Sequence, residues 1–374
     1  IRDVLGSRGL GDVYKRQDLL RRDEALYEGQ EFYACILDEA QAIKNHTTQK
    51  YKAVCKVRSR VRFALTGTPV ENRLGELWSI FSFLMPGYLP PYKSFCSRFE
   101  KPIVQEEDQT AVRRLNQLTG PFILRRMKAD VLKELPPKTE NVYRIELEEE
   151  QRKLYLAAVV DAREKLRAAK PEDKMAVFAV LMRLREICCD PRLIADNWEG
   201  GSAKLDACVE LISGAVEGGH RILLFSQFTS MLELLAKRLD AEGISHFTLQ
   251  GSTPKPVRAE LVRRFNGGEV SVFLISLRAG GTGLNLTAAD IVIHYDPWWN
   301  VAAQNQATDR AYRIGQQNPV QVYKLIAQDS IEEKIVELQQ AKQSLADTVT
   351  GTADGAILSM RPDELLQLLE GSEG

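Results

Sequence analysis

From residue 220 onwards, short apolar runs alternate with amphipathic segments. The runs RILLFSQF, HFTLQG, VSVFLIS, DIVIHYD and VQVYKLIA have the length and the β-branched and aromatic content of buried strands. Between them, SMLELLAKRLDAEG and PVRAELVRRFNGG place apolar residues at helical spacing and close on glycine. Strands that alternate with helices predict a parallel sheet covered by helices. The pattern therefore predicts a nearly complete doubly wound α/β domain.

The chain before residue 136 shows a shorter form of the same alternation. FYACILDEA and RVRFALTGTP read as two buried strands, PFILRRMK reads as a further strand, and GELWSIFSFLMPG reads as an apolar helix. These elements predict part of a second α/β domain.

Residues 136–200 have a different character. ELPPKTE breaks the chain, and EEEQRKLYLAAVVDAREKLRAAK and DKMAVFAVLMRLREICCDP then follow with helical periodicity. We interpret this region as a helical connection or protrusion. Near the end of the chain, SIEEKIVELQQAKQSLADTV predicts a charged amphipathic helix, TGTADG a flexible link and RPDELLQLLEG a short closing helix.

Composition restricts the possible functions. The 374 residues are enough for two or three domains, and the net charge of −1 means that any nucleic-acid binding must come from a local patch. The six cysteines form no C-x-x-C pair and the four histidines are scattered, so we expect reduced thiols in a cytosolic protein. No apolar run approaches membrane-spanning length, so no membrane partner is expected.

CILDEAQ places two carboxylates directly after an apolar run. Ligands of α/β domains sit at the carboxyl ends of parallel strands. There, Asp38 can hold Mg²⁺, and Glu39 can orient or deprotonate an attacking water. A solvated acidic loop is the alternative interpretation.

Two further stretches before residue 70 have candidate phosphate contacts. In ALTGTPVEN, Thr66 and Thr68 flank a glycine, and their hydroxyl and backbone N–H groups can hold a phosphate of ATP or of DNA. A plain strand-ending turn is the alternative. KYKAVCKVRSRVR has six basic residues and no acid, which suits a DNA-facing patch or, equally, a solvated helix face.

SLRAGGTGLNLTAADIVIHYDPWWN combines a glycine-rich turn with a tryptophan pair. Gly281 and Gly283 allow close approach of the backbone to a phosphate chain, and Arg278 precedes them. Trp298 and Trp299 can stack on bases if they are exposed. The alternative is that both indoles pack between the domains.

QATDRAYRIGQ places Gln306, Arg310 and Arg313 at helical spacing, which predicts that they share one helix face. Two arginines one turn apart suit a finger that contacts phosphate. A salt-bridged helix surface is the alternative.

Together these stretches resemble the Swi/Snf family of ATP-dependent DNA translocases, in helicase superfamily two. DEAQ resembles the DEAH/DEAQ box (motif II), LTGTPVEN motif III, LLFSQFTSML motif IV, SLRAGGTGLNLTAAD motif V and QATDRAYRIGQ motif VI. LRRMKADVLKELPPK resembles the block that closes the first lobe, and SIEEKI the helix that braces the lobes. The resemblance covers residues from about 33 to about 347, and motifs that are weak singly become specific in this order.

The resemblance implies an α/β protein with two RecA-like P-loop-NTPase lobes, ATP between them and double-stranded DNA across the cleft. It implies ATP and Mg²⁺ as cofactors, and DNA-bound proteins as further partners; an oligomer is not implied. The residues implied in catalysis are Glu39, Arg310 and Arg313. Those implied in nucleotide binding are Asp38, which would also hold the metal, Gln41, Gly281, Gly283 and Gln306. Those implied in DNA binding are Thr68, Arg278 and Trp298.

The chain departs from the family pattern at two positions in this region. Tyr312 stands where the family usually has His, and Val301 where it usually has Pro. Neither change removes a phosphate contact, so we expect no loss of activity from them.

The beginning of the chain does not fit the pattern. GSRGLGDVYKRQ has a G-x-x-x-x-G spacing, but Asp12 and Val13 stand where a P-loop has Lys and Ser or Thr. Gly11 and Asp38 are 27 positions apart, whereas one βαβ unit needs about 30 or more residues. We therefore expect an incomplete first lobe without its P-loop, and residues 1–17 that are foreign to it.

The expected organisation follows. Residues 1–17 form the foreign lead-in, 18–135 the partial first lobe, 136–200 the helical linker or protrusion, 201–350 the second lobe with its brace helix, and 351–374 the link and closing helix. The expected function is that of the C-terminal portion of a DNA-stimulated ATPase that translocates on duplex DNA and remodels protein–DNA complexes. We expect it to be inactive by itself, and to belong to a prokaryotic, cytoplasmic, nucleoid-associated protein. The alternative is a non-catalytic DNA-binding or scaffolding module.

Overall fold

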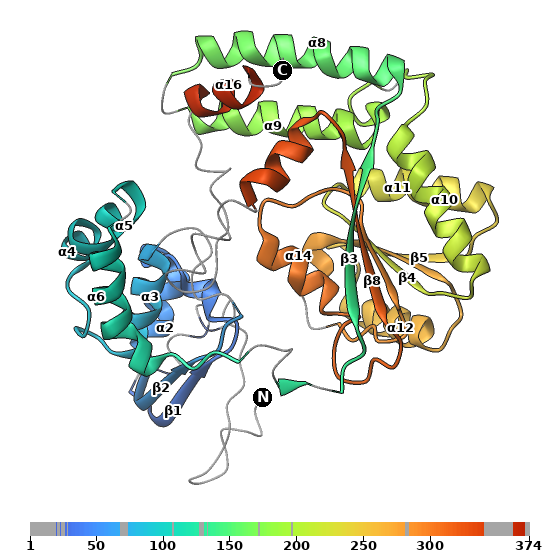
Figure 1. Cartoon of the computed structure of the whole chain (residues 1–374). Helices are drawn as coiled ribbons and strands as arrows, with labels where there is room; N and C mark the ends of the chain where they lie inside the picture. The colour runs from blue at the N-terminus through green and yellow to red at the C-terminus, as the bar shows by residue number, and fades with distance from the viewer. Residues whose placement is uncertain are drawn as a thin grey trace. The chain divides into compact units, whose positions relative to one another are not determined.

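The computed structural model divides into two compact units (Figure 1). The first comprises Ile1–Leu124 with Gln343–Ala353, and the second Arg125–Lys342 with Asp354–Gly374. The structure describes residues 20, 23, 27, 29–67, 74–106, 108–126, 131–132, 134–170, 173–195, 197–280, 284–339 and 362–370. The lead-in at 1–17 lies outside these residues.

The first unit is built on two parallel strands, β1 (Glu31–Leu37) and β2 (Arg58–Ala64), paired in register from Glu31↔Arg58 to Leu37↔Ala64. The strands predicted from FYACILDEA and RVRFALTGTP are thereby confirmed as strands. The prediction that they are buried is wrong, because Leu37 is their only buried residue. Helix α2 (Gln49–Lys56) connects them and begins where the Thr48 hydroxyl accepts a hydrogen bond from Tyr51 N at 3.3 Å. Helix α3 (Leu74–Leu84) is an apolar helix, as predicted, and most of its residues are buried.

Among the described residues, helices pack against only one face of this two-stranded sheet. Leu37, Val54 and Phe83 form a buried cluster on that face. On the other face the register partners Ile36 and Phe63 are 62% and 52% exposed. Side chains at paired positions of parallel strands point to the same face of the sheet. Ile36 and Phe63 therefore lie side by side on one exposed apolar face in the described part of the unit.

Short helices complete the first unit: α4 (Tyr92–Phe95), a π-helical segment (Cys96–Glu100), α5 (Lys101–Gln105) and α6 (Gln109–Thr119). The strand predicted from PFILRRMK is wrong for its described residues. Gly120–Phe122 form a 3₁₀ turn, residues 123–126 are not in a strand, and Leu124 is 79% exposed. An apolar run forms a strand only where a neighbouring strand offers hydrogen bonds, and β1 and β2 pair only with each other among the described residues.

The second unit contains a six-stranded parallel sheet in the order β3-β8-β7-β4-β6-β5. All five strands predicted after residue 220 are present. The strands are β3 (Lys138–Ile145), β4 (Ile222–Ser226), β5 (His246–Leu249), β6 (Val272–Ser276), β7 (Ile291–His294) and β8 (Val320–Ala327). Every residue of β4, β6 and β7 is buried, which explains their continuous apolar sequence.

Strand β3 corrects the interpretation of residues 136–200 as helical throughout. It pairs with β8 over eight residues, from Lys138↔Val320 to Ile145↔Ala327, at the edge of the sheet. Only Ile145 of β3 is buried, so its sequence lacks the apolar run that marks the central strands.

Helices cover both faces of this sheet (Figure 1). On one face, Ile222 and Leu224 of β4 pack in a cluster with α10 (Ala203–Glu217) and α11 (Thr229–Ala241). On the other, Leu223 and Phe225 pack in a cluster that also contains Phe265 of α12 (Lys255–Asn266). Successive residues of β4 therefore pack into two different hydrophobic cores, one on each face of the sheet.

A helical layer adjoins the sheet. Helices α8 (Glu149–Ala168) and α9 (Lys174–Cys189) lie side by side with α16 (Pro362–Glu370) (Figure 1). Their shared core includes Tyr155, Leu184 and Leu365, together with Ile331 from the helix at 331–339. The helices predicted for α8, α9 and α16 are confirmed, and the helix predicted from residue 330 is confirmed as far as residue 339. No helix within the described residues is long and apolar enough to cross a membrane.

Candidate functional site

The two carboxylates of the DEAQ stretch follow the end of β1. Leu65 N donates to Leu37 O at 2.7 Å, and Ala40 N donates to Leu65 O at 2.9 Å. These bonds continue the pairing beyond the last residues of β1 and β2. Asp38 and Thr66 therefore leave neighbouring strand ends, where α/β domains bind their ligands.

Hydrogen bonds join the side chains at these two strand ends. Gln41 Nε2 donates to Glu39 Oε2 at 2.6 Å, and Thr66 Oγ1 donates to Gln41 Oε1 at 2.8 Å. Glu39 itself has φ 50° and ψ 53°, in the left-handed region that non-glycine residues rarely adopt. Such backbone geometry recurs at functional sites. Gln41 thus connects the acidic turn after β1 to the hydroxyl after β2.

The residues at this edge fit a magnesium ion bound with nucleotide phosphates. Asp38 is exposed, with Oδ1 accepting from Glu39 N at 3.0 Å. Within the described residues no group of three or more His, Cys, Asp or Glu could hold a metal by itself. Mg²⁺ commonly binds through one or two carboxylates plus substrate phosphates, so an all-protein cage is not required.

The motif VI residues of the second unit do not share one helix face, contrary to the prediction. Helix α14 (Val301–Thr308) carries Gln306 and ends at Thr308. Arg310 lies in the turn that follows, where its carbonyl accepts from Leu286 N at 3.0 Å. This bond holds the chain against the segment after the glycine-rich stretch, so the helix does not continue.

The two arginines differ in exposure. Arg310 is 8% exposed, whereas Arg313 is exposed and its Nη1 donates to Leu284 O at 3.4 Å. Tyr312 lies between them in sequence, with Lys138 Nζ 5.8 Å from its ring centroid. Arg313 is therefore the more accessible cation of the pair.

Both ends of α14 are held by side-chain hydrogen bonds. Asn300 Oδ1 accepts from Ala303 N at 2.7 Å and caps the first turn. At the other end, His294 Nε2 lies 2.8 Å from Thr308 Oγ1. Burial, and then the charges of Lys324 and Lys138, lower the pKa of His294 to about 3, although Glu140 acts in the opposite direction.

Three predicted site residues lie outside the described residues: Thr68, Gly281 and Gly283. Arg278 belongs to the short helix α13 (Leu277–Gly280), which directly follows β6. Its backbone thus stands at the carboxyl end of a central strand.

The tryptophan pair is not an exposed stacking platform. Trp299 is 4% exposed in the core shared with α8 and α9, with the Arg185 guanidinium 4.2 Å from its ring centroid. Trp298 is half-buried and packs against two core clusters. Its carbonyl accepts a hydrogen bond from Gln339 Nε2. Packing inside the second unit therefore accounts for Trp299 and for part of Trp298.

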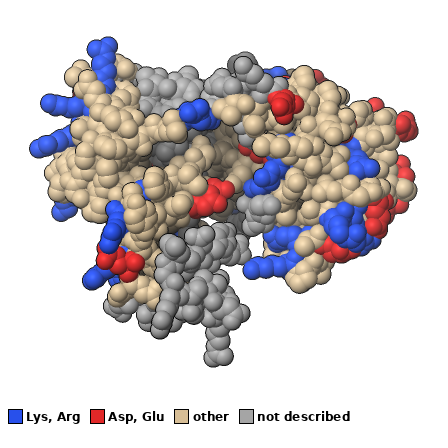
Figure 2. All heavy atoms as spheres, turned by 90° about the horizontal axis from the view of Figure 1, so that it is seen from below, with Lys and Arg blue, Asp and Glu red and all other residues tan. Residues whose placement is uncertain are grey.

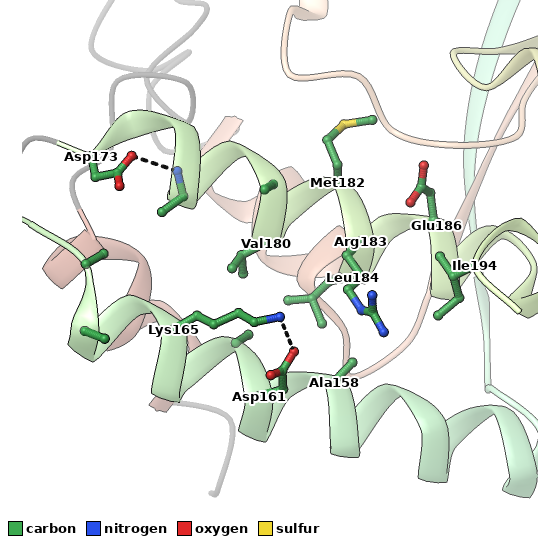
Figure 3. Close-up of a pocket in the computed structure, with 15 residues that line it drawn as sticks. Ala158, Asp161, Lys165, Asp173, Val180, Met182, Arg183, Leu184, Glu186 and Ile194 are labelled. Atoms are coloured by element: carbon green, nitrogen blue, oxygen red, sulfur yellow. Dashed lines mark hydrogen bonds and ion pairs between the residues drawn. The ribbon is translucent and has the colours of Figure 1, made fainter.

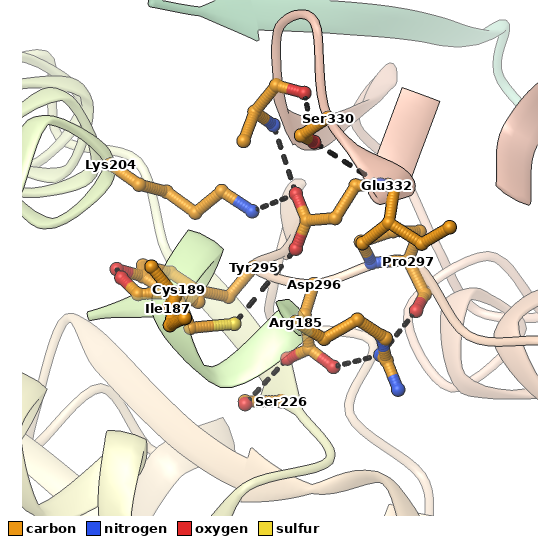
Figure 4. A network of polar contacts seen from close by, with 12 residues as sticks. Arg185, Ile187, Cys189, Lys204, Ser226, Tyr295, Asp296, Pro297, Ser330 and Glu332 are labelled. Atoms are coloured by element: carbon orange, nitrogen blue, oxygen red, sulfur yellow. Dashed lines mark hydrogen bonds and ion pairs between the residues drawn. The ribbon is translucent and has the colours of Figure 1, made fainter. Parts of the chain in front are cut away.

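Two fully buried ion pairs lie near this segment and were not predicted from the sequence (Figure 4). Arg185 Nη2 is 3.1 Å from Asp296 Oδ2, and Lys204 Nζ contacts Glu332 Oε2. All four side chains are completely buried. The apolar run of α9 contains two arginines, Arg183 and Arg185, and the local sequence does not indicate that Arg185 is the buried one.

A pocket between α8 and α9 lies apart from these groups (Figure 3). Alanines such as Ala162 and Ala176 line it, and Lys165 Nζ pairs with Asp161 Oδ2 at 2.7 Å on its wall. None of the predicted site residues that the structure describes lines this pocket.

The basic stretch at 50–62 divides between structural and exposed residues. Arg62 donates from Nη1 to Phe83 O at 2.7 Å and from Nη2 to Val57 O at 3.0 Å, so it holds β2 against α3. Arg58 and Arg60 are exposed. Figure 2 shows Lys and Arg side chains projecting at several places on one face, with Asp and Glu among them. Because the Arg62 guanidinium is bonded within the unit, only part of the stretch is an exposed basic surface.

Comparison with known proteins identifies related chains. The family model for the SNF2-related domain matches residues 14–193, and that for the helicase conserved C-terminal domain matches residues 203–315. A Mycoplasma pneumoniae protein named as an ATP-dependent helicase is 40% identical over 358 residues, which cover 94% of this chain and 34% of that protein. A mouse SWI/SNF-related matrix-associated actin-dependent regulator of chromatin, subfamily A member 1, is 35% identical over 94% of this chain and 35% of its own length.

This chain is also similar to a solved structure of an SNF2-type protein. The SWI2/SNF2 ATPase core of Sulfolobus solfataricus, in complex with double-stranded DNA, is 34% identical, with a TM-score of 0.53. The match covers 93% of this chain and 75% of that one. This chain spans about a third of the length of the curated relatives cited above.

Proposed function

The chain belongs to the SNF2-related family of helicase-like ATPases, and from this premise we propose that it is part of a motor that translocates on duplex DNA. The motor would use ATP with Mg²⁺ and remodel DNA-bound protein complexes. The observation that carries the proposal is the set of bonds joining Glu39, Gln41 and Thr66 at the ends of two parallel strands. If these residues only stabilised the fold, they would not need to include exposed acidic side chains or a glutamate whose backbone is in the left-handed region.

In the proposed mechanism the first unit supplies the hydrolytic groups. Asp38 would hold Mg²⁺, which would neutralise charge on the phosphates when bound. Glu39 would orient the attacking water or take its proton, and Gln41 would hold the Glu39 carboxylate in place through its amide N–H. The Thr66 hydroxyl would fix the orientation of the Gln41 amide through the other amide atom.

The second unit would supply cations and nucleotide contacts. Arg313 would stabilise the negative charge that develops on the transferred phosphoryl group, with Arg310 beside it in the turn. Gln306, Gly281 and Gly283 would contact the nucleotide. Thr68, Arg278 and the exposed part of Trp298 would contact the DNA strand.

The proposed location follows from the proposed partner. A motor that acts on duplex DNA works at the chromosome, and the Mycoplasma pneumoniae relative supports a bacterial nucleoid. Fluorescence microscopy of the tagged protein would test this location, and exclusion of the signal from the DNA would contradict it.

Hydrolysis measurements test the proposed activity. In the whole protein that contains this chain, ATP turnover should rise on addition of duplex DNA. The variant Glu39→Gln should lose about 10²-fold or more of that turnover, because it keeps the size of the side chain but not its basicity. Its DNA affinity should stay the same. DNA binding without any turnover in the wild-type protein would favour the non-catalytic binding module.

A further inference from the structure

Arg185 is a buried cation at the junction between α9 and the segment at 296–300. Its Nη2 donates to Asp296 Oδ2 at 3.1 Å and to Pro297 O at 2.6 Å (Figure 4). Its guanidinium also lies 4.2 Å from the Trp299 ring centroid and 5.4 Å from that of Phe228. One side chain of the helical layer thus contacts three of the six residues between β7 and α14.

Stability alone does not explain a charge at this position. Arg185 is completely buried, and its Nε and Nη1 have no hydrogen-bond partner among the described residues. Burying two charges is costly, and apolar residues of similar volume often replace such pairs without loss of stability. A buried pair that is incompletely satisfied is better explained by the conformation that it specifies.

Asp296 connects this arginine to the end of a second strand. Ser226 Oγ donates to Asp296 Oδ1 at 2.6 Å, and Gln227 N lies 3.2 Å from the same oxygen. The carboxylate therefore accepts from α9 and from the end of β4 at once. The segment leads directly to Asn300, which caps α14.

We propose that Arg185 is a positioning residue that sets where α14 begins, and thereby where Gln306, Arg310 and Arg313 stand. This inference rests on the proposed function, because it assumes that those three side chains meet the nucleotide. Holding Asp296, Pro297 and Trp299 in one arrangement fixes both ends of the short segment. The effect on the arginines is transmitted through α14, whose far end is tied by the bond between Thr308 and His294.

The second buried pair provides a matched control. Lys204 is also completely buried and contacts Glu332, whose Oε2 also accepts from Ala327 N at 2.9 Å. This pair holds the start of the helix at 331–339 instead of the start of α14. Lys204 Nζ also lies 5.6 Å from the Tyr295 ring centroid, just before the segment at 296–300. Replacing either cation by methionine removes a buried charge, and the segment to which the cation is hydrogen-bonded differs between the two.

Hydrogen exchange of the 374-residue chain tests the inference directly. In Arg185→Met, exchange of the Val301–Thr308 amides should rise about tenfold or more, equivalent to about 1.4 kcal/mol, with a smaller rise at 331–339. In Lys204→Met, the larger rise should be at 331–339. Equal rises at both segments in both variants, or no rise at 301–308 in Arg185→Met, would overturn the inference.

Two further variants keep the test decisive if Arg185→Met does not fold. Arg185→Lys keeps the charge but lacks the planar fork that reaches Asp296 and Pro297 together. It should raise exchange at 301–308 partly. Arg185→Met/Asp296→Asn removes the unpaired buried carboxylate and should fold, yet still show the local rise. Protection at 301–308 equal to wild type in both variants contradicts the inference.

A kinetic measurement separates this inference from the proposed function. In the whole protein, Arg185→Lys should lower kcat for DNA-stimulated hydrolysis about tenfold while KM for ATP stays within about twofold. An unchanged kcat beside the local rise in exchange would overturn the role in positioning the arginines. If the wild-type protein does not hydrolyse ATP, the proposed function fails, and with it that role, while the exchange result still decides whether Arg185 holds α14.

Discussion

Gln41 and Thr66 are joined by a hydrogen bond of 2.8 Å between side chains at the ends of two parallel strands. The same Gln41 amide donates to Glu39 at 2.6 Å. The proposed catalytic carboxylate is therefore held by a residue that is itself oriented from the neighbouring strand.

This relationship predicts that Gln41 and Thr66 act as one unit. Gln41→Ala should lower ATP turnover of the whole protein about tenfold, because Glu39 loses its oriented donor. Thr66→Val should have a smaller effect in the same direction. The double variant should be no slower than Gln41→Ala, since the second change removes a bond that no longer exists. Steady-state rates of the four proteins measure this, and additive losses would mean that the two residues act separately.

The exposed Arg313 gives a second prediction. Arg313→Ala should reduce DNA-stimulated hydrolysis of the whole protein by roughly 10³ to 10⁵, because a cation is lost where phosphoryl charge develops. Arg313→Lys should recover little, since lysine lacks the planar fork. DNA affinity of both variants, measured by fluorescence anisotropy, should match wild type.

Replacing Arg278 should have the opposite effect: loss of DNA affinity without loss of basal hydrolysis. Its position after β6 and the resemblance to motif V predict a phosphate contact on DNA. Arg278→Ala should weaken DNA binding, flatten its dependence on salt and leave basal hydrolysis intact. Affinities at two salt concentrations test this. If Arg313→Ala loses DNA affinity while its hydrolysis persists, the roles of the two arginines must be exchanged.

The lowered pKa of His294 predicts how the free energy of unfolding depends on pH. Its pKa is about 3 in the folded protein, against 6.5 as the ordinary value. Between these values the unfolded state binds more protons, so the free energy of unfolding falls as pH falls below 6.5 towards 3. The slope contributed by this residue approaches about 1.4 kcal/mol per pH unit.

Urea unfolding at pH 7, 6 and 5 measures this slope. The matched variant is His294→Asn, in which the amide can still bond Thr308 but cannot titrate. Its unfolding free energy should fall less between pH 7 and pH 5 than that of wild type, by about 2 kcal/mol. Parallel pH profiles would show that His294 does not carry the dependence.

The pairing of β3 with β8 predicts the extent of the stable second unit. A fragment of residues 136–370 should unfold cooperatively, whereas residues 201–350 alone should be much less stable. The shorter fragment lacks β3 and leaves Asp296 without Arg185, although it keeps the pair of Lys204 and Glu332. Breaking one such buried pair costs about 3–5 kcal/mol. Thermal melts followed by circular dichroism compare them, and equal midpoints would contradict the assigned role of β3 and α9.

The sequence alone determined those elements whose local pattern is compatible with only one kind of secondary structure. Strands such as β4 and β6 are continuous apolar runs because both of their faces are covered, and no tertiary knowledge was needed to recognise them. The placement of Asp38 at a strand end followed from the same reasoning. The order of the motifs along the sequence was also sufficient to identify the family.

Only the tertiary structure decided features that depend on a distant partner. Strand β3 exists because β8 offers it an edge, and α14 ends at Thr308 where Leu286 binds the chain beyond it. Arg185 and Asp296 are far apart in sequence, yet they form a buried pair. Local periodicity encodes which face of an element is buried, but the identity of the group that buries it is set by the packing of the whole unit.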